Sequence, residues 1–133
     1  MIKSMTGYGG AKGGGKTWAV RTKALLGAYY YPGIRILVMR RTYGELQSNL
    51  IEPMRQALRP SLARYSAERR TIYFANGSLI RFGHWAEGRS EAEYNGQEFD
   101  WIFIDEATQF TWRAFQFLGS LLRGVNDFPK RMY

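Results

Sequence analysis

Two stretches of the chain are apolar at almost every position, and both are predicted to be buried strands. Residues 34–39 contain the run Ile-Leu-Val-Met, and residues 101–104 read Trp-Ile-Phe-Ile. Continuous apolar runs of this length are typical of parallel strands that are covered on both faces. A shorter strand is expected over residues 2–6, and residues 131–133 fit the start of another. The pattern therefore predicts an α/β fold with a mostly parallel sheet.

Apolar residues recur at helical spacing between these runs. The first helix is expected over residues 16–30, ahead of a Pro-Gly pair that ends it. The second covers residues 46–58, where Pro53 either kinks one helix or opens another. A third is expected between a threonine cap, at position 108 or 111, and Gly124. These helices are predicted to flank the sheet.

A β-hairpin is predicted around Asn76-Gly77, which separates two short runs of strand-forming residues. With a two-residue turn, Phe74 would face Leu79 across the ladder. Tyr73 would likewise face Ile80. This pairing is structural, and the hairpin is expected as an insertion in the α/β fold.

Length and composition limit the class of protein. The chain has 133 residues, of which 45% are hydrophobic, so residues 1–133 are expected to form a single domain with one packed core. Residues 87–98 are expected to be a polar loop without a domain boundary. The absence of cysteine excludes disulfides and cysteine-bound zinc, and a lone histidine excludes a multi-histidine metal site. With no membrane-spanning run and no signal peptide, a soluble intracellular protein is expected.

Basic residues are in clear excess, and most of them are arginines. Nineteen lysines and arginines against eleven acidic residues give a net charge of +8. This charge favours polyanionic partners such as nucleic acid, and the planar guanidinium of arginine suits phosphate contacts. The alternative is that several arginines pair locally or solvate helix faces, and charge alone does not decide between the two.

A glycine-rich stretch satisfies the phosphate-binding pattern G-x-x-x-x-G-K-[ST] at every fixed position. Its residues are Gly10, Ala11, Lys12, Gly13, Gly14, Gly15, Lys16 and Thr17. The glycines allow successive N–H groups to turn toward the phosphates of ATP, above the positive end of the following helix. Lys16 is expected on the β- and γ-phosphates, and Thr17 is expected to offer its hydroxyl to Mg²⁺. The alternative is a flexible linker that matches by accident.

Asp105 and Glu106 follow directly after the second apolar run. In open α/β sheets, ligands bind beyond the C-terminal ends of the strands. Asp105 is expected to bind the Mg²⁺ shell together with Thr17. Glu106 is expected to orient or deprotonate the water that attacks the γ-phosphate. The alternative is an ordinary acidic pair at a helix N-terminus, but together with the glycine-rich loop the pair predicts an ATP hydrolase in which Lys16 and Glu106 are catalytic.

Three segments resemble the ATPase half of large terminase subunits, the DNA-packaging motors of tailed bacteriophages. They are residues 9–17, residues 38–46, which read Val-Met-Arg-Arg-Thr-Tyr-Gly-Glu-Leu, and residues 94–110, which lead through Gly-Gln-Glu-Phe-Asp into the acidic pair. The match covers most of the chain. Its specificity lies in the combination of segments, because phosphate-binding loops of this type occur in many families.

This resemblance implies a P-loop ATPase of the additional-strand (ASCE) type that pumps double-stranded DNA with ATP and Mg²⁺. It also implies a homo-oligomeric ring in the full-length form, with the portal protein and the small terminase subunit as partners, in the cytoplasm of the infected bacterial host. Further site residues follow from it. Lys12 stands four positions before the loop lysine, where terminases often place a basic residue, so it is a candidate catalytic residue that senses or stabilises the γ-phosphate. The alternative is a solvated loop lysine. Arg40 or Arg41 is a candidate arginine finger in trans, with DNA contact or local pairing with Glu45 as equal alternatives.

The chain also departs from the family pattern. The family's central additional strand has barely begun at residues 131–133, so the sheet is expected to be incomplete at this end. We expect that a nuclease domain is absent and that the chain lacks an adenine-contacting segment upstream of the loop. The chain therefore resembles a fragment or a truncated form. Alternatives are a non-catalytic nucleotide- or DNA-binding remnant, or a helicase or recombination ATPase.

Overall fold

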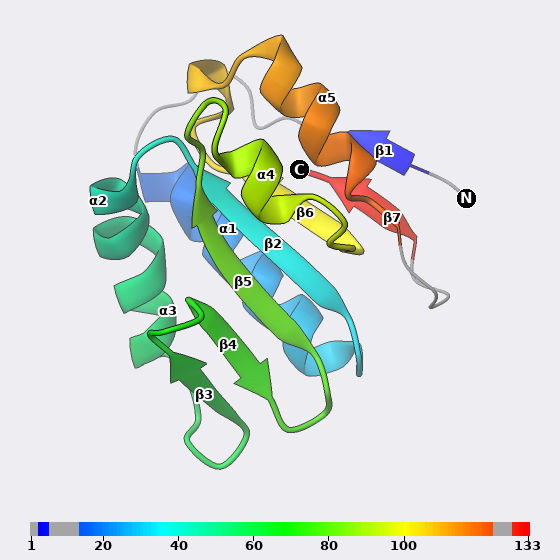
Figure 1. Cartoon of the computed structure of the whole chain (residues 1–133). Helices are drawn as coiled ribbons and strands as arrows, with labels where there is room; N and C mark the ends of the chain where they lie inside the picture. Colours follow the sequence, from blue (N-terminus) through cyan, green and yellow to red (C-terminus); the bar gives the residue numbers. More distant parts are fainter. Residues whose placement is uncertain (1–2, 6–13, 124–128) are drawn as a thin grey trace.

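The computed structural model describes residues 3–5, 14–123 and 129–133, and within them the strands form one seven-stranded sheet (Figure 1). The strands run in the spatial order β1-β7-β6-β2-β5-β4-β3. Their bounds are β1 Lys3–Met5, β2 Arg35–Arg40, β3 Ala63–Ser66, β4 Thr71–Phe74, β5 Leu79–His84, β6 Trp101–Ile104 and β7 Lys130–Met132. The neighbours from β1 to β5 are parallel, and the last two pairs are antiparallel. The predicted mostly parallel α/β sheet is confirmed.

The last strand occupies a central place in the sheet. β7 pairs in parallel with β1 on one side, where Ser4 is opposite Arg131, and with β6 on the other, where Ile102 is opposite Met132. It therefore separates the strand before the glycine-rich loop from the strand before Asp105. This is the additional-strand arrangement that the resemblance implied.

Helices cover both faces of the sheet. They are α1 Gly14–Tyr30, α2 Tyr43–Leu46, α3 Glu52–Gln56, α4 Ser90–Tyr94 and α5 Trp112–Ser120, with a π-helical segment at Gln47–Ile51 and a 3₁₀ turn at Ala107–Gln109. One buried cluster joins α1 and the α2–α3 region to one face, through residues such as Val20, Leu50 and Phe82. A second joins α4 and α5 to the other face, through residues such as Leu37, Tyr94 and Leu118.

The helix boundaries follow local signals. Helical residues run without a break from Tyr43 to Gln56, and Pro53 lies within this stretch, directly after its π-helical part, so it does not open a separate second helix. The Thr111 hydroxyl accepts a hydrogen bond from the Ala114 N–H and caps α5. Residues 87–98 were expected to be a loop, but α4 forms within them because Tyr94 is buried against the sheet. Of the described helices, none has the length and apolar character to cross a membrane.

The hairpin register differs from the prediction by one residue. Tyr73 is opposite Leu79 rather than Ile80. The Phe74 N–H donates to the carbonyl of Ser78, so the turn contains three residues instead of two. Gly77 takes the left-handed conformation (φ 89°) that such a turn needs, and the Asn76 side chain donates to the Ala28 carbonyl of α1. This tertiary contact draws the turn toward α1.

Candidate nucleotide-binding site

Two parallel strands bring the predicted functional residues together at one edge of the sheet. In the register of β2 and β6, Met39 is opposite Ile104, so the next residues, Arg40 and Asp105, are neighbours. The Asp105 N–H donates to the Met39 carbonyl over 2.9 Å, which extends the pairing into the site. This is the C-terminal edge of the parallel strands, where ligands bind in open α/β sheets.

The first turn of α1 meets the end of β6 through a direct hydrogen bond. The Thr17 hydroxyl lies 3.1 Å from Oδ2 of Asp105 and 3.4 Å from Oδ1. Both residues are buried, at 8% and 3% exposed. Two segments that are 88 positions apart in the sequence therefore form one site, as the sequence predicts.

Arg40 lies at the centre of a cluster of carboxylates. Its guanidinium lies 2.5 Å from Asp105, 3.1 Å from Glu45 and 3.4 Å from Glu106. The residue is only 4% exposed, and its Nε atom is buried without a hydrogen-bond partner among the described residues. The three carboxylates compensate for the cost of burying the positive charge of this guanidinium. Of the alternatives for Arg40, this geometry corresponds to local pairing.

Glu106 has an unusual backbone conformation. Its φ and ψ are 58° and 49°, in the left-handed region that residues with a Cβ rarely adopt. Its side chain is 41% exposed, unlike that of Asp105. Outliers of this kind cost about 1–3 kcal/mol and cluster at functional sites. The turn places the carboxylate of Glu106 at the open side of the site, while Asp105 stays buried.

The outer side of the cluster is formed by α2. Glu45 accepts a hydrogen bond from the Thr42 hydroxyl, and this bond together with the Arg40 charge lowers the pKa of its carboxyl group. Arg41 points to a different neighbour, because its guanidinium donates to the Trp85 carbonyl over 2.8 Å. The two adjacent arginines therefore have separate environments, and the carboxylate cluster belongs to Arg40.

The predicted phosphate-binding loop is described only in part. Gly10, Ala11, Lys12 and Gly13 lie outside the described residues, whereas Gly14 and Gly15 form the start of α1. Lys16 follows them, half-buried, one position before Thr17. Within the described part of the chain, no three His, Cys, Asp or Glu residues group as a metal site. The hydroxyl of Thr17 and the carboxylate of Asp105 nevertheless supply the oxygen ligands that Mg²⁺ prefers, with its other positions left to phosphates and water.

Sequence reasoning missed one part of this arrangement, the contact of Arg40 with both residues of the acidic pair. The signal was present, because Arg40 and Asp105 each follow directly after an apolar strand. The sequence did not show that these two strands, β2 and β6, are neighbours in the sheet. The Arg41 contact with a backbone carbonyl has no comparable sequence signal.

Comparison with known proteins agrees with this geometry. Residues 8–127 match the family model "Terminase large subunit, T4likevirus-type, N-terminal". No curated protein matches the chain. A crystal structure of the large terminase from a thermophilic bacteriophage is 15% identical over 99% of the chain, with a TM-score of 0.69. The complex of that terminase with ADP is 17% identical, with a TM-score of 0.70. The large terminase ATPase domain of Thermus phage P74-26 is 12% identical over 98% of the chain, with a TM-score of 0.70.

The chain is shorter than these structures. It covers 32% and 33% of the two full terminase structures and 57% of the isolated ATPase domain. At these identities, the structural likeness shows the fold, which is that of terminase ATPase domains. The family model covers most of the sequence and includes the residues of the site. The chain therefore belongs to the T4-type large terminase family, whose N-terminal part it matches.

Proposed function

We propose that this chain binds and hydrolyses ATP as part of a viral DNA-packaging motor that moves double-stranded DNA into a capsid. The observation that carries the proposal is the hydrogen bond between Thr17 and Asp105, which joins the phosphate-loop helix to the acidic pair. Solved terminases of similar fold have been crystallised with ADP and with ATP-γ-S. Family membership supports the proposal independently.

In this proposal each residue has a separate task. Lys16 and the N–H groups of the loop hold the phosphates, with Lys12 as a second cation on the γ-phosphate. Thr17 and Asp105 would hold Mg²⁺, which when bound neutralises phosphate charge. Glu106 is half-exposed and faces the open side, where its carboxylate orients the attacking water and accepts a proton. The catalysis is positioning and charge stabilisation.

The same proposal includes the partners and the compartment of such a motor. The full-length protein would form a homo-oligomeric ring on the portal protein, receive DNA from the small terminase subunit and act in the cytoplasm of the infected bacterium. The present chain is the nucleotide-binding part of that assembly.

ATP turnover by the purified chain tests this function. We expect hydrolysis that requires Mg²⁺ and rises when duplex DNA is added.

Lys16→Ala should weaken ATP binding about ten- to a hundredfold, because a hydrogen bond to a charged group contributes about 1.5–3 kcal/mol. Lys23→Ala, on the same helix, is the matched control and should bind ATP normally. A folded chain that binds ATP without turnover would instead support a non-catalytic remnant.

We also propose that Arg40 is a positioning residue that acts within its own site. Its planar guanidinium group pairs with three carboxylates, and a lysine ammonium cannot reproduce that geometry. Arg40→Lys is therefore expected to lower kcat about ten- to a hundredfold through misplacement of Glu106 and Asp105, with little change in KM. Arg55→Lys is the control, since Arg55 is a half-exposed arginine of α3 that pairs with Glu52 and lies outside the carboxylate cluster.

A mixing experiment separates this role from an arginine finger in trans. Chains with Arg40→Lys are combined with Lys16→Ala chains, which retain Arg40 but are impaired in ATP binding. If Arg40 acts in its own site, turnover of the mixture equals the sum of the two separate activities. Recovery of turnover above that sum would show that Arg40 reaches a neighbour's nucleotide and would overturn the positioning role.

A further inference from the structure

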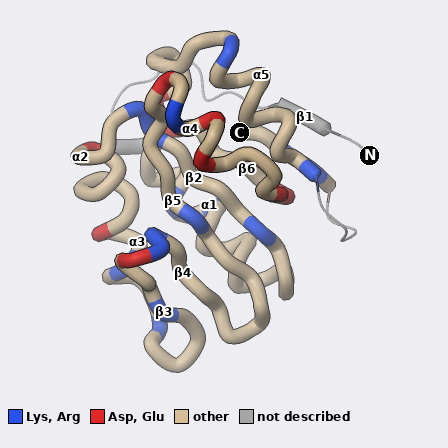
Figure 2. The backbone as a smooth tube through the Cα atoms, viewed as in Figure 1, with Lys and Arg blue, Asp and Glu red and all other residues tan. Residues whose placement is uncertain are grey.

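Part of the sheet carries an arginine-rich surface far from the nucleotide site. In Figure 1, α1 lies behind the sheet, while α4 lies in front of β2 and β6, so β3, β4 and the lower part of β5 have no described helix in front of them. Side chains on this face are polar where the helix-covered face is apolar. Figure 2 shows basic positions on β2, β3 and β5 in this area.

Strand register explains how these side chains gather. Arg64 is opposite Tyr73, Tyr73 is opposite Leu79, and Leu79 is opposite Arg35, so the four form a row across β3, β4, β5 and β2. The next row on the same face contains Thr71 opposite Arg81. Residues two apart along a strand are about 6.6 Å apart, and neighbouring strands are about 4.8 Å apart. These spacings bring basic and hydroxyl groups together around Leu79.

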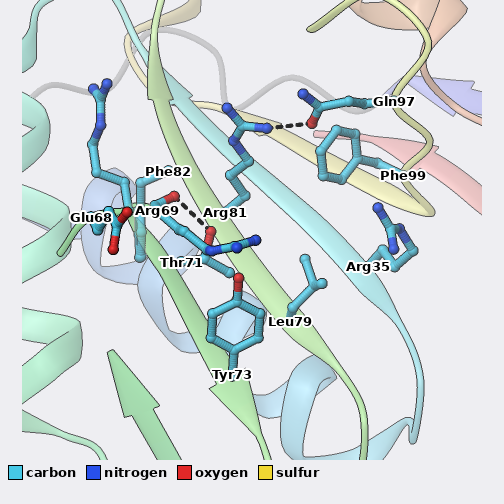
Figure 3. Close-up of a pocket in the computed structure, with 11 residues that line it drawn as sticks. Arg35, Glu68, Arg69, Thr71, Tyr73, Leu79, Arg81, Phe82, Gln97 and Phe99 are labelled. Carbon is cyan, nitrogen blue, oxygen red and sulfur yellow. Dashed lines mark hydrogen bonds between the residues drawn. The ribbon is translucent and has the colours of Figure 1, made fainter. Parts of the chain in front are cut away.

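A cavity of about 370 Å³ is centred on these side chains (Figure 3). Its lining includes Arg35, Arg69, Arg70 and Arg81, against the single carboxylate of Glu68. The carboxylate of Glu93, from α4, lies beside it and pairs with Arg81 over 3.2 Å. Counting both acids, the surface keeps an excess of positive charge. It suits an anionic ligand with several charges.

The arginines differ in how many hydrogen bonds their guanidinium groups already make to other described residues. Arg81 donates hydrogen bonds to Gln97 and Glu93, and these bonds hold its guanidinium in place. Arg35 is exposed and uses Nε to donate to the Glu98 carbonyl, which leaves both terminal nitrogens without a hydrogen bond to any described residue. Arg69 is exposed, and its guanidinium has no partner in the described part of the chain. Arg35 and Arg69 are therefore able to contact phosphates.

The aromatic rings nearby are not presented for base stacking. Arg64 lies over the Tyr73 ring at 5.1 Å, and Arg70 lies over the Tyr43 ring at 5.3 Å. Stacking platforms for single-stranded nucleic acid need an accessible ring face. A basic surface whose nearby tyrosine rings each have an arginine over one face favours the sugar-phosphate backbone of a duplex, which is contacted without reference to sequence.

We propose that the arginine surface formed by Arg35, Arg69, Arg70 and Arg81 binds the phosphate backbone of double-stranded DNA. This deepens the proposed function, on which it rests for the identity of the polyanion, because it assigns the surface that touches the transported DNA. Arg35 and Arg40 are at opposite ends of β2, about 16 Å apart by strand rise. The Arg35 end of the surface is therefore separate from the nucleotide site, whereas Arg70 lies over Tyr43 of α2, the helix that carries Glu45. Binding of DNA and binding of nucleotide are measured independently.

Fluorescence anisotropy with a short labelled duplex tests this assignment on the 133-residue chain. The double variant Arg35→Ala/Arg69→Ala is expected to lose about tenfold in affinity at about 100 mM salt, and the slope of log K against log salt should decrease by about two. The matched control, Arg59→Ala/Arg123→Ala, removes the same charge from two exposed arginines outside the cavity lining. The control should change affinity less than about threefold, because neither arginine lies on the proposed surface.

Each result of the DNA-binding measurements either supports or contradicts the assignment of the arginine surface. Duplexes of unrelated sequence should bind equally, and a single strand should compete weakly. Equal losses in the double variant and its control would show diffuse attraction and overturn the proposal, as would tighter binding of single strands or no DNA binding by the unmodified chain. Binding of a fluorescent ATP analogue is measured in parallel. If it is retained while DNA binding is lost, the chain is folded; if both are lost, Arg69→Glu alone repeats the test.

Discussion

Glu106→Gln is expected to reduce ATP turnover about a thousandfold while ATP remains bound, because a positioned general base contributes about 10²–10⁴-fold. Glutamine keeps the size and hydrogen bonding of the side chain but cannot accept the proton. The left-handed backbone at Glu106 and its contact with Arg40 hold the group at the open side of the site. Single-turnover hydrolysis, with a fluorescent ATP analogue as the binding probe, gives the two quantities separately.

The matched control for this variant is Glu52→Gln, which removes a half-exposed carboxylate that pairs with Arg55 across one turn of α3 and accepts a hydrogen bond from Gln47. Surface pairs of this kind contribute about 0–1 kcal/mol, so turnover should not change. Normal turnover by Glu106→Gln would remove Glu106 from the catalytic step. Loss of ATP binding in that variant would instead assign Glu106 to substrate binding.

Much of this site was predictable from sequence because its chemistry demands particular residue types in order. A loop that surrounds phosphates needs glycines, a lysine and a hydroxyl, and Thr17 meets Asp105 as that pattern requires. The continuous apolar runs before Arg40 and Asp105 predicted parallel strands, and both lie in the middle of the sheet. These features depend on local sequence and on a general rule for α/β sheets.

The rest depended on contacts between distant segments. Local sequence does not tell whether an arginine after a strand faces water or a carboxylate on the next strand, so the burial of Arg40 required the pairing of β2 with β6. The hairpin register depended on Asn76, whose side chain bonds to α1 instead of serving a two-residue turn. α4 forms in a polar stretch because Tyr94 packs against Gly83, where a Cβ atom would collide with its hydroxyl.

Asp100→Asn is expected to destabilise the fold by about 3–5 kcal/mol, because it removes the carboxylate charge that pairs with the buried ammonium of Lys130. Lys130 Nζ lies 2.7 Å from Asp100 Oδ1, and the side chains are 2% and 1% exposed. The other carboxylate oxygen accepts the Arg35 N–H over 2.9 Å, so the same residue also orders the start of β2. Urea unfolding followed by circular dichroism measures the change.

Two comparisons identify the cause of that loss. Glu91→Gln breaks the pair with the largely exposed Arg113, whose guanidinium lies 3.4 Å away, and should cost less than about 1 kcal/mol. Asp100→Asn/Lys130→Met removes both charges, keeps an amide oxygen that can accept the Arg35 N–H, and should recover most of the stability, since neutral replacement of a buried pair often costs little. If Asp100→Asn were as stable as the unmodified chain, the pair would not hold β7 in place. Because β7 separates the strand before the phosphate loop from the strand before Asp105, ATP binding should fall in parallel with stability and return in the double variant.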